Sequence, residues 1–534
     1  MSAAETASPP RTRSLAAAAA VVAVGFLGSR LLGVVRTVAI ANAFGTDPRL
    51  DAYWVAFRIP DLIFQVIAGA TLASAFIPTF SRAVTRRGEE EAWRLASAVL
   101  NLVTLATAVL AVAAFLAAPW VVPALAPGLG EDAGRGAELQ GLAVDLTRLM
   151  LLSPILFAVS GMFMGILNAR HHFLLPALAP MMYNLSIIAG ALLLAEPFGV
   201  HGLAVGVVAG AALHLLIQVP ALPRVGMRYA PVLRWRDPGV REVGRLMAPR
   251  IFGLAAAQAN FFLIGIFFAS LLGGSAISAL NYAWLIVMLP LGLFGMAIST
   301  AVFPTLADQA AAEARDELRA TLARSLRLIL YLTLPAAAGL MLLRTPIIAA
   351  LLEHGAFDAT STALTAGALL FYALGLPAQA AIEILSRGFY ALSDTKTPVA
   401  LAVLSLVLNA ALSALLIGPL EHEGLALALS LAVTAEAALL YAVLRRRLGG
   451  LEDRATAASL ARTGAAAAVM AAAVAALLWG PVPLEAVAPG RSLDAFVEAG
   501  VAAAAGALVF LAAGLALGCE EAGLLARRLR LRAA

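Results

Sequence analysis

The sequence predicts an all-α polytopic membrane protein with about 14 transmembrane helices, arranged as two parallel six-helix lobes plus two C-terminal helices. Three observations support this fold. Of the 534 residues, 62% are hydrophobic and only 13% are charged. Apolar stretches near the ~20 residues that a span needs recur along the whole chain, and short motifs of the first half return in the second. Soluble domains carry about a quarter charged residues, so this composition excludes a soluble enzyme, a disordered protein and a fibrous protein.

The predicted spans are the apolar stretches, taken in order. They are residues 15–35, 52–80, 95–118, 143–168, 174–195, 199–222, 246–272, 277–304, 322–343, 362–386, 398–418, 424–444, 459–481 and 496–519. The first follows Arg11 and Arg13 as in a signal peptide, but it runs on through Gly28 and Arg30, so we expect an uncleaved helix. The second contains two helix breakers, Pro60 and Pro78.

The distribution of basic residues predicts the orientation. Counted over alternate loops and both termini, 28 Arg and Lys residues lie on one side and 4 on the other. The four are Arg49, Arg135, Arg344 and Arg491. Basic loops stay in the cytoplasm, so both termini are expected to be cytoplasmic and the number of spans to be even.

Four stretches divide the chain. We expect an N-lobe over 1–222, a cytoplasmic linker over 223–245, a C-lobe over 246–447, and the last two spans with a basic tail over 448–534. In the linker, Trp235 lies among arginines, which would suit anionic lipid headgroups. The alternative is a loop that only fixes the orientation.

An internal repeat supports the two lobes. Four short motifs recur in order at offsets of 220 to 226 residues: Ser29-Arg30-Leu31-Leu32-Gly33 as Pro249-Arg250-Ile251-Phe252-Gly253, Pro176 as Pro398, His201-Gly202-Leu203-Ala204 as Glu423-Gly424-Leu425-Ala426, and Ala75-Phe76-Ile77-Pro78-Thr79 as Ala301-Val302-Phe303-Pro304-Thr305. Six spans return the chain to its starting side, so the copies have the same orientation. Parallel repeats are typical of transporters that bind their substrate between the halves.

Charged residues within apolar spans are candidate site residues, because each is costly to insert into a membrane. Arginine binds phosphate well, since its planar fork donates two parallel hydrogen bonds. A cluster of span arginines would therefore suit a phosphate- or diphosphate-bearing substrate; the alternative is that they reach the interface or pair with carboxylates. The arginines are Arg30, Arg36, Arg58 and Arg250. Asp51 is expected to partner an arginine, and Glu383 either to pair with Arg387 or to bind a coupling ion.

Several chemistries are absent from the sequence. The only lysine, Lys396, does not lie in a Gly-Lys-Ser/Thr motif, so no ATP site is expected, and transport would be driven by an ion gradient, the membrane potential or a partner. No histidine or cysteine spacing suggests a metal site, and no cofactor is expected. A lipid-linked glycosyltransferase would need an outer acceptor domain, and the predicted outer loops are too short.

Several motifs together resemble the lipid II flippase family MurJ, also called MviN, of the multidrug/oligosaccharidyl-lipid/polysaccharide flippase superfamily. They are Ser29-Arg30-Leu31-Leu32-Gly33-x-x-Arg36, Phe44-Gly45, Asp51-Ala52-x-x-Val55-Ala56-Phe57-Arg58-Ile59-Pro60, Ala75-Phe76-Ile77-Pro78, Phe389-Tyr390-Ala391-x-x-Asp394-x-x-Thr397-Pro398 and Gly418-Pro419-Leu420. The resemblance covers nearly the whole chain. It implies a non-enzymatic flippase in the bacterial cytoplasmic membrane that moves undecaprenyl-diphosphate-linked peptidoglycan precursor to the outer leaflet by alternating access.

The resemblance also implies a cationic cavity, to which Arg30 and Arg36 correspond, with Asp51 matching the family aspartate and Arg58 in a position often held by lysine. The last two helices of the family help to form a groove for the lipid tail. Expected partners are the diphosphate lipid, membrane lipids and cell-wall synthesis machinery; no nucleic acid is expected, and the chain is expected to be a monomer.

The sequence departs from the family at several charged positions. Phe64 and Gln65 follow Pro60-Asp61-Leu62-Ile63 where an arginine is usual, and Trp284 and Leu285 replace an Asp-Arg pair. Thr37 and Gly69 stand in place of acidic residues. Either Arg58 and Arg250 compensate, or the chain moves another lipid-linked polysaccharide, exports small molecules, or is a scaffold that no longer transports.

Overall fold

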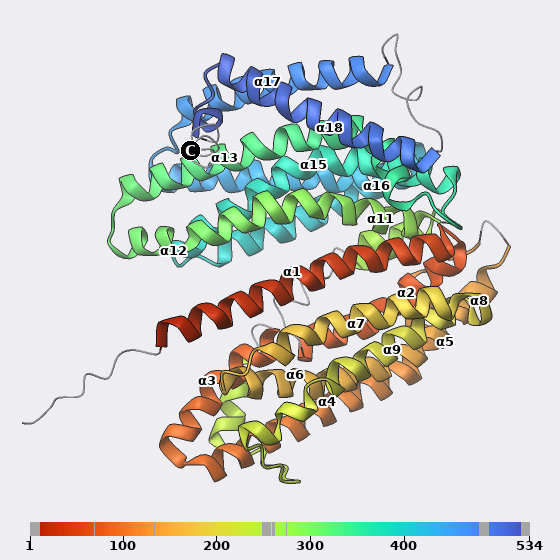
Figure 1. Ribbon diagram of the computed structural model, residues 1–534, viewed down its shortest axis with the longest axis vertical. Coiled ribbons are helices and arrows are strands. Elements are labelled where there is room, and N and C mark those ends of the chain that lie inside the picture. Colours follow the sequence, from red (N-terminus) through yellow and green to blue (C-terminus); the bar gives the residue numbers. More distant parts are fainter. Residues whose placement is uncertain are drawn as a thin grey trace, which may run out of the picture. The chain divides into compact units, whose positions relative to one another are not determined.

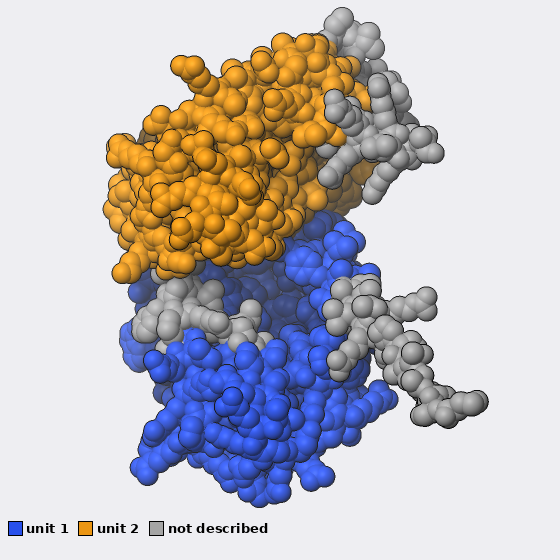
Figure 2. All heavy atoms as spheres, turned by 90° about the vertical axis from the view of Figure 1, so that its left-hand side faces the viewer, with its two compact units in different colours: residues 1–262 blue, residues 263–534 orange. Residues whose placement is uncertain are grey.

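The computed structural model describes residues 11–68, 70–131, 134–247, 258, 262–273, 275–479 and 491–524. Every regular element in these ranges is helical, which confirms the predicted fold class (Figure 1). The chain forms two compact units, residues 1–262 and 263–534 (Figure 2). The predicted linker 223–245 therefore belongs to the first unit.

Unit 1 is built from helices whose long members are mainly apolar. They are α1 (Arg11–Phe44), α2 (Pro48–Ile63), the π-helical turn η1 (Phe64–Ala68), α3 (Ala70–Arg87), α4 (Glu89–Leu125), α5 (Gly136–Met150), α6 (Leu152–Ala169), α7 (Leu174–Leu193), α8 (Ala195–Phe198), α9 (Val200–Leu216) and the short 3₁₀ turns η2 (Val219–Ala221) and η3 (Pro223–Val225). Their core contains Phe76, Phe80 and Trp93: the rings of Phe76 and Phe80 on α3 stack, and Phe80 packs at a tilt against Trp93 on α4.

Unit 2 contains the remaining helices. They are the π-helical turn η4 (Leu263–Phe268), α11 (Ala276–Pro290), the π-helical turn η5 (Leu291–Met296), α12 (Ala297–Ala311), α13 (Arg315–Leu342), α14 (Arg344–Leu352), α15 (Ala359–Ala391), α16 (Lys396–Leu448), α17 (Asp453–Trp479) and α18 (Arg491–Ala516).

Eleven helices in the described ranges are long and apolar enough to cross a membrane. One of them, α16, has 53 residues and would hold two of the predicted spans, because its backbone leaves the helical region at Glu421. The predicted span 52–80 is divided among α2, η1 and α3, and Pro60 lies inside α2 just before the π-helical turn. Residues 248–257 and 259–261 of the predicted span 246–272 lie outside the described residues.

The internal repeat is also present in the backbone. Residues with positive φ end helices at matching places in the two halves, 222 or 223 positions apart: His171 (59°) and Ser393 (60°), Gly199 (56°) and Glu421 (48°), Gly226 (73°) and Gly449 (72°). The repeated Gly-Leu-Ala motif has the same tight contact in each copy. A Cβ on Gly202 would lie 2.5 Å from the carbonyl oxygen of Leu194, and one on Gly424 would lie 2.4 Å from that of Leu416.

The Asp394-x-x-Thr397-Pro398 motif begins α16. The Asp394 carboxylate accepts hydrogen bonds from the Lys396 and Thr397 backbone N–H groups, at 2.9 and 3.0 Å, and from the Thr397 hydroxyl at 2.6 Å. It also pairs with Arg447 near the end of the same long helix. These hydrogen bonds hold the pKa of Asp394 well below its usual value. The motif is therefore a helix cap that also ties the two ends of α16 together.

A mostly buried ion-pair group joins the C-terminal helices to α13. Arg327, 8% exposed, lies 2.7 Å from a Glu452 carboxylate oxygen and 3.8 Å from one of Glu521, which is itself 5% exposed. Deeper in the same contact, the rings of Tyr331 and Phe510 are 4.8 Å apart. Helices α17 and α18 are thus attached to α13 by both charge and packing.

The backbone repeat predicts a stabilising substitution. Glu421 adopts φ 48° and ψ −133°, close to the 56° and −139° of Gly199 at the equivalent position. A side chain is strained there by about 1–3 kcal/mol. We expect Glu421→Gly to stabilise the protein by roughly 1 kcal/mol after the entropy loss of glycine, measured as a higher Tm in detergent or nanodiscs.

Glu421→Ala is the matched control, since it removes the charge but keeps the Cβ. An equal gain in Tm for both variants would assign the effect to the charge and refute backbone strain at this position.

Candidate functional site

The face that α1 presents to α7 is set by small residues. A Cβ on Gly25 would lie 2.6 Å from the Cβ of Ala177, so only glycine allows this approach. One turn further on, the Asn184 amide donates a hydrogen bond of 3.3 Å to the Ser29 carbonyl oxygen. These contacts fix the rotation of α1 about its axis, and with it the directions in which the arginines point.

Arg36 and Arg58 are both close enough to one carboxylate to interact with it. Asp61 interacts electrostatically with both guanidinium groups. Arg36 also interacts with the phenols of Tyr53 on α2 and Tyr183 on α7, so it lies on the side of α1 that faces these helices. We call Arg36, Arg58, Asp61 and Gln65 the unit 1 charge cluster.

The π-helical turn η1 positions the last member of this cluster. The Gln65 amide donates to an Asp61 carboxylate oxygen at 2.6 Å, one turn back along the chain. Its carbonyl oxygen accepts a hydrogen bond from the Gln258 amide. Such π-helical turns often occur at functional sites, because they alter which side chains share a helix face.

Arg30 does not share the position of Arg36. It lies 120° away around α1, is exposed, and its guanidinium carbon lies 5.1 Å from the centre of the Phe26 ring. Arg250, its counterpart in the repeat, lies outside the described residues. The structure therefore brings together two of the four predicted arginines.

Asp51 lies in the first turn of α2 and is 2% exposed. The preceding Asp47 caps this helix: its carboxylate accepts a hydrogen bond of 2.6 Å from the Arg49 backbone N–H. Burial at a helix N-terminus suits a carboxylate that stabilises the helix.

Glu383 lies half-buried on α15 and interacts electrostatically with Arg387, one turn later. Arg387 in turn donates to the Thr300 hydroxyl at 3.3 Å and covers the Phe303 ring at 5.4 Å. The second carboxylate near this group is Glu436 on α16, 9% exposed and hydrogen-bonded to Ser405.

Sequence reasoning missed three polar features. Asp61 stands in the motif Pro60-Asp61-Leu62-Ile63 without a predicted role, although Arg58 and Asp61 are three residues apart and so share a helix face. Glu436 is an isolated carboxylate in an apolar stretch, and that signal alone could have identified it. The third feature is a buried network between α6 and α9, where Ser160 lies 2.7 Å both from His214 Nδ1 and from the Gln218 amide nitrogen.

At the positions that depart from the family pattern, the side chains pack against neighbours or form local hydrogen bonds. Trp284 packs edge-on against Tyr372 on α15, with ring centres 5.5 Å apart. The Thr37 hydroxyl donates to the Gly33 carbonyl oxygen of its own helix at 3.1 Å. Phe64 packs against Phe157 at 4.5 Å. None of these three positions contributes a charge.

A repeated, all-helical architecture with arginines inside apolar helices defines a polytopic membrane transporter. The family model described as lipid II flippase MurJ matches residues 40–480. A lipid II flippase MurJ from Burkholderia cenocepacia is 34% identical over 425 residues, covering 78% of this chain and 81% of that protein. The chain belongs to the lipid II flippase MurJ family and is a multi-span membrane protein.

Solved structures show the same fold. A structure described as lipid II flippase MurJ in an inward closed conformation has a TM-score of 0.75 at 25% identity, covering 92% of this chain and 97% of that one. An inward-facing multidrug-resistance transporter of the MATE family has a TM-score of 0.65 at 16% identity, with 80% of this chain and 96% of that one covered. The second likeness is one of fold alone.

The charge cluster yields a prediction about anion affinity. Asp61 interacts electrostatically with both arginines, so it competes with any anion for them. We expect Asp61→Asn to bind a short-chain isoprenyl diphosphate about three- to tenfold more tightly, or roughly 0.7–1.4 kcal/mol, by calorimetry in nanodiscs.

Asp145→Asn, which removes an exposed carboxylate of α5, makes the same charge change away from the cluster and should leave the affinity unchanged. Weaker binding by Asp61→Asn would show that the carboxylate positions the arginines instead of competing for them.

Proposed function

We propose that this protein is a flippase for lipid II, the undecaprenyl-diphosphate-linked peptidoglycan precursor, and moves it from the inner to the outer leaflet by alternating access. The observation that carries the proposal is the family match over residues 40–480. The arginine pair in unit 1 supports it, since a guanidinium retains its charge and donates in parallel to two phosphate oxygens.

In this proposal the substrate diphosphate replaces Asp61 as the partner of Arg36 and Arg58. Arg30 and Arg250 are further candidate contacts, Asp51 stabilises α2, and Glu383 is the candidate ligand of a coupling ion. The protein is a transporter without catalytic activity or cofactor, driven by the membrane potential or an ion gradient. It acts as a monomer in the bacterial cytoplasmic membrane, beside the cell-wall synthesis machinery.

A second candidate substrate is another lipid-linked polysaccharide. The uncharged residues at Phe64, Gln65, Trp284 and Leu285 favour it, because they leave fewer cations for the disaccharide-peptide headgroup of lipid II. Both substrates carry a diphosphate, so the arginine pair serves either one.

Complementation distinguishes these functions. A strain depleted of its own lipid II flippase should grow when it expresses this protein, and lipid II should accumulate in the outer leaflet. Arg36→Ala or Arg58→Ala should abolish rescue at normal membrane abundance. Each loses charge-assisted hydrogen bonds worth roughly 1.5–3 kcal/mol, or about 10- to 150-fold in substrate affinity.

Lysine at either position should restore transport only in part, because a point charge does not reproduce the bidentate fork. Arg148→Ala removes a span arginine near Phe115 of α4 and is the control for the loss of charge. A wild-type protein that is abundant in the membrane but rescues nothing would favour the second substrate, and unimpaired rescue by both alanine variants would eliminate the arginine pair as the binding site.

Labelling tests the proposed orientation, with both termini in the cytoplasm. In a Cys519→Ser background, Glu131→Cys should react with an impermeant maleimide in intact cells. Asp316→Cys, whose native side chain is 92% exposed, should react only after permeabilisation. The reverse pattern would contradict the orientation that the basic loops indicate.

A further inference from the structure

The linker segment after η3 is fixed along the side of α4. The Asn101 amide donates to the carbonyl oxygens of Ala230 and Val232, at 3.4 and 3.0 Å. One turn earlier, the Ser97 hydroxyl accepts from the Ala230 N–H at 3.0 Å. The Tyr229 hydroxyl donates to the Asn101 side chain at 3.1 Å. The segment is therefore held at a defined height on the helix.

That height is the start of the apolar part of α4, where the edge of the hydrocarbon layer is expected. Ser97 and Asn101 lie 8 and 12 residues beyond Glu89, so they are about 12 and 18 Å along α4 from its first residue. Arg94 is the last charged residue of this helix, and every residue from Leu95 to Leu125 is uncharged. The linker thus descends past the charged turns of α4 to the start of its apolar part.

Apolar and aromatic side chains of this segment are exposed. Tyr229, Leu233 and Trp235 have 59%, 56% and 58% of their surface accessible. The Arg236 guanidinium lies over the Trp235 ring at 4.4 Å, and Arg228 is also exposed. We call these five residues the linker patch. Tyrosine and tryptophan are enriched where membranes meet water, since one end of each ring is apolar and the other polar.

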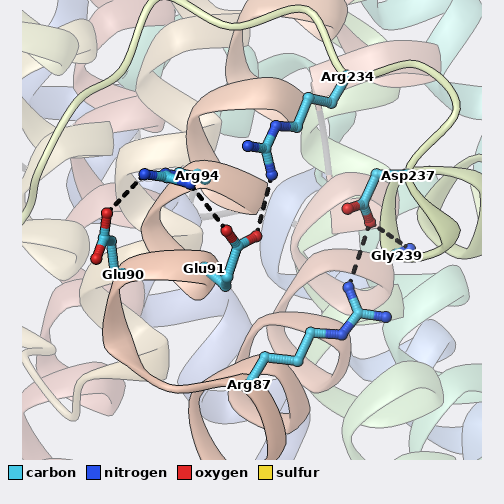
Figure 3. A network of polar contacts seen from close by, with 7 residues as sticks. All are labelled: Arg87, Glu90, Glu91, Arg94, Arg234, Asp237 and Gly239. Atoms are coloured by element: carbon cyan, nitrogen blue, oxygen red, sulfur yellow. Dashed lines mark hydrogen bonds and ion pairs between the residues drawn. The ribbon is translucent and has the colours of Figure 1, made fainter.

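The nearby carboxylates are each paired with a different arginine, which leaves the linker patch positive. The pairs are Glu89 with Arg170, Glu90 with Arg94, Glu91 with Arg234 and Asp237 with Arg87, three of them drawn in Figure 3. Asp237 also accepts a hydrogen bond from the Gly239 backbone N–H at 2.7 Å. Arg228 also interacts with Glu89, but that carboxylate is already paired with Arg170, so the arginines around the linker patch outnumber the carboxylates.

We propose that the linker patch is a docking surface for the anionic phospholipids of the cytoplasmic leaflet. Leu233 and Trp235 enter the boundary between headgroups and acyl chains, while Arg228 and Arg236 bind the lipid phosphates. In Figure 3, Arg234 pairs with Glu91 of α4 and Asp237 with Arg87 at the end of α3, and these pairs hold the segment in place, so it is presented to the lipid without a change in fold. This inference rests on the orientation proposed above.

The depth of a spin label tests the proposal in the full-length protein. Leu233→Cys in the Cys519→Ser background is labelled and reconstituted in nanodiscs of phosphatidylcholine alone, or of phosphatidylcholine mixed with phosphatidylglycerol. We expect oxygen to relax the label several-fold more strongly than a water-soluble nickel chelate, with a larger difference when phosphatidylglycerol is present. A label at Asp316→Cys should show the opposite preference in both lipids.

Two charge changes separate lipid binding from simple proximity to the membrane. Arg228→Glu with Arg236→Glu should remove the effect of phosphatidylglycerol on the Leu233 label. Arg241→Glu, an exposed linker arginine outside the patch, should retain it. The proposal is overturned if the label at 233 has the same relaxation preference as the label at 316. It is also overturned if phosphatidylglycerol does not change the relaxation of the 233 label in the protein that keeps Arg228 and Arg236. Flipping is measured independently by complementation, so this proposal and the proposed function can fail separately.

Discussion

The hydrocarbon layer cannot solvate a peptide group or a charge, and this constraint accounts for most of the molecule. Backbone hydrogen bonds must be satisfied within each spanning segment, so long apolar stretches become helices. Charged side chains within those helices need partners inside the protein. Asp61, which interacts with Arg36 and Arg58, and Glu383, which interacts with Arg387, meet this need in the two units.

The unit 1 charge cluster shows how such a partner also serves binding. An arginine pair without a counterion would be costly to keep inside an apolar lobe and would repel itself. One carboxylate that interacts with two guanidinium groups leaves a net charge of +1, which lowers the repulsion between the arginines yet still attracts an anion. Gln65 shares the carboxylate at 2.6 Å, so it restrains Asp61 without adding a charge of its own.

Composition, loop charge and repeated motifs were sufficient to predict the fold, because they follow directly from the length and polarity of each segment. They also placed a break between residues 418 and 424 and a helix breaker at Pro60, but not the form that either takes. The π-helical turn after Pro60 and the positive φ at Glu421 depend on local geometry that apolar runs do not reveal. Nor did they separate Arg30 from Arg36, since the rotation of α1 is set by the contact of Gly25 with Ala177 on a helix far along the chain.

The contacts of Arg327 with Glu452 and Glu521 decide whether the C-terminal helices can be removed from the rest of the chain. They fall outside the six-helix repeat, and a later addition to a two-lobe ancestor would be expected to be removable. Yet a chain ending before Glu452 would leave the Arg327 guanidinium buried without either carboxylate, and breaking a buried pair costs about 3–5 kcal/mol. The Arg327 contacts therefore make the stability of α13 depend on the two C-terminal helices.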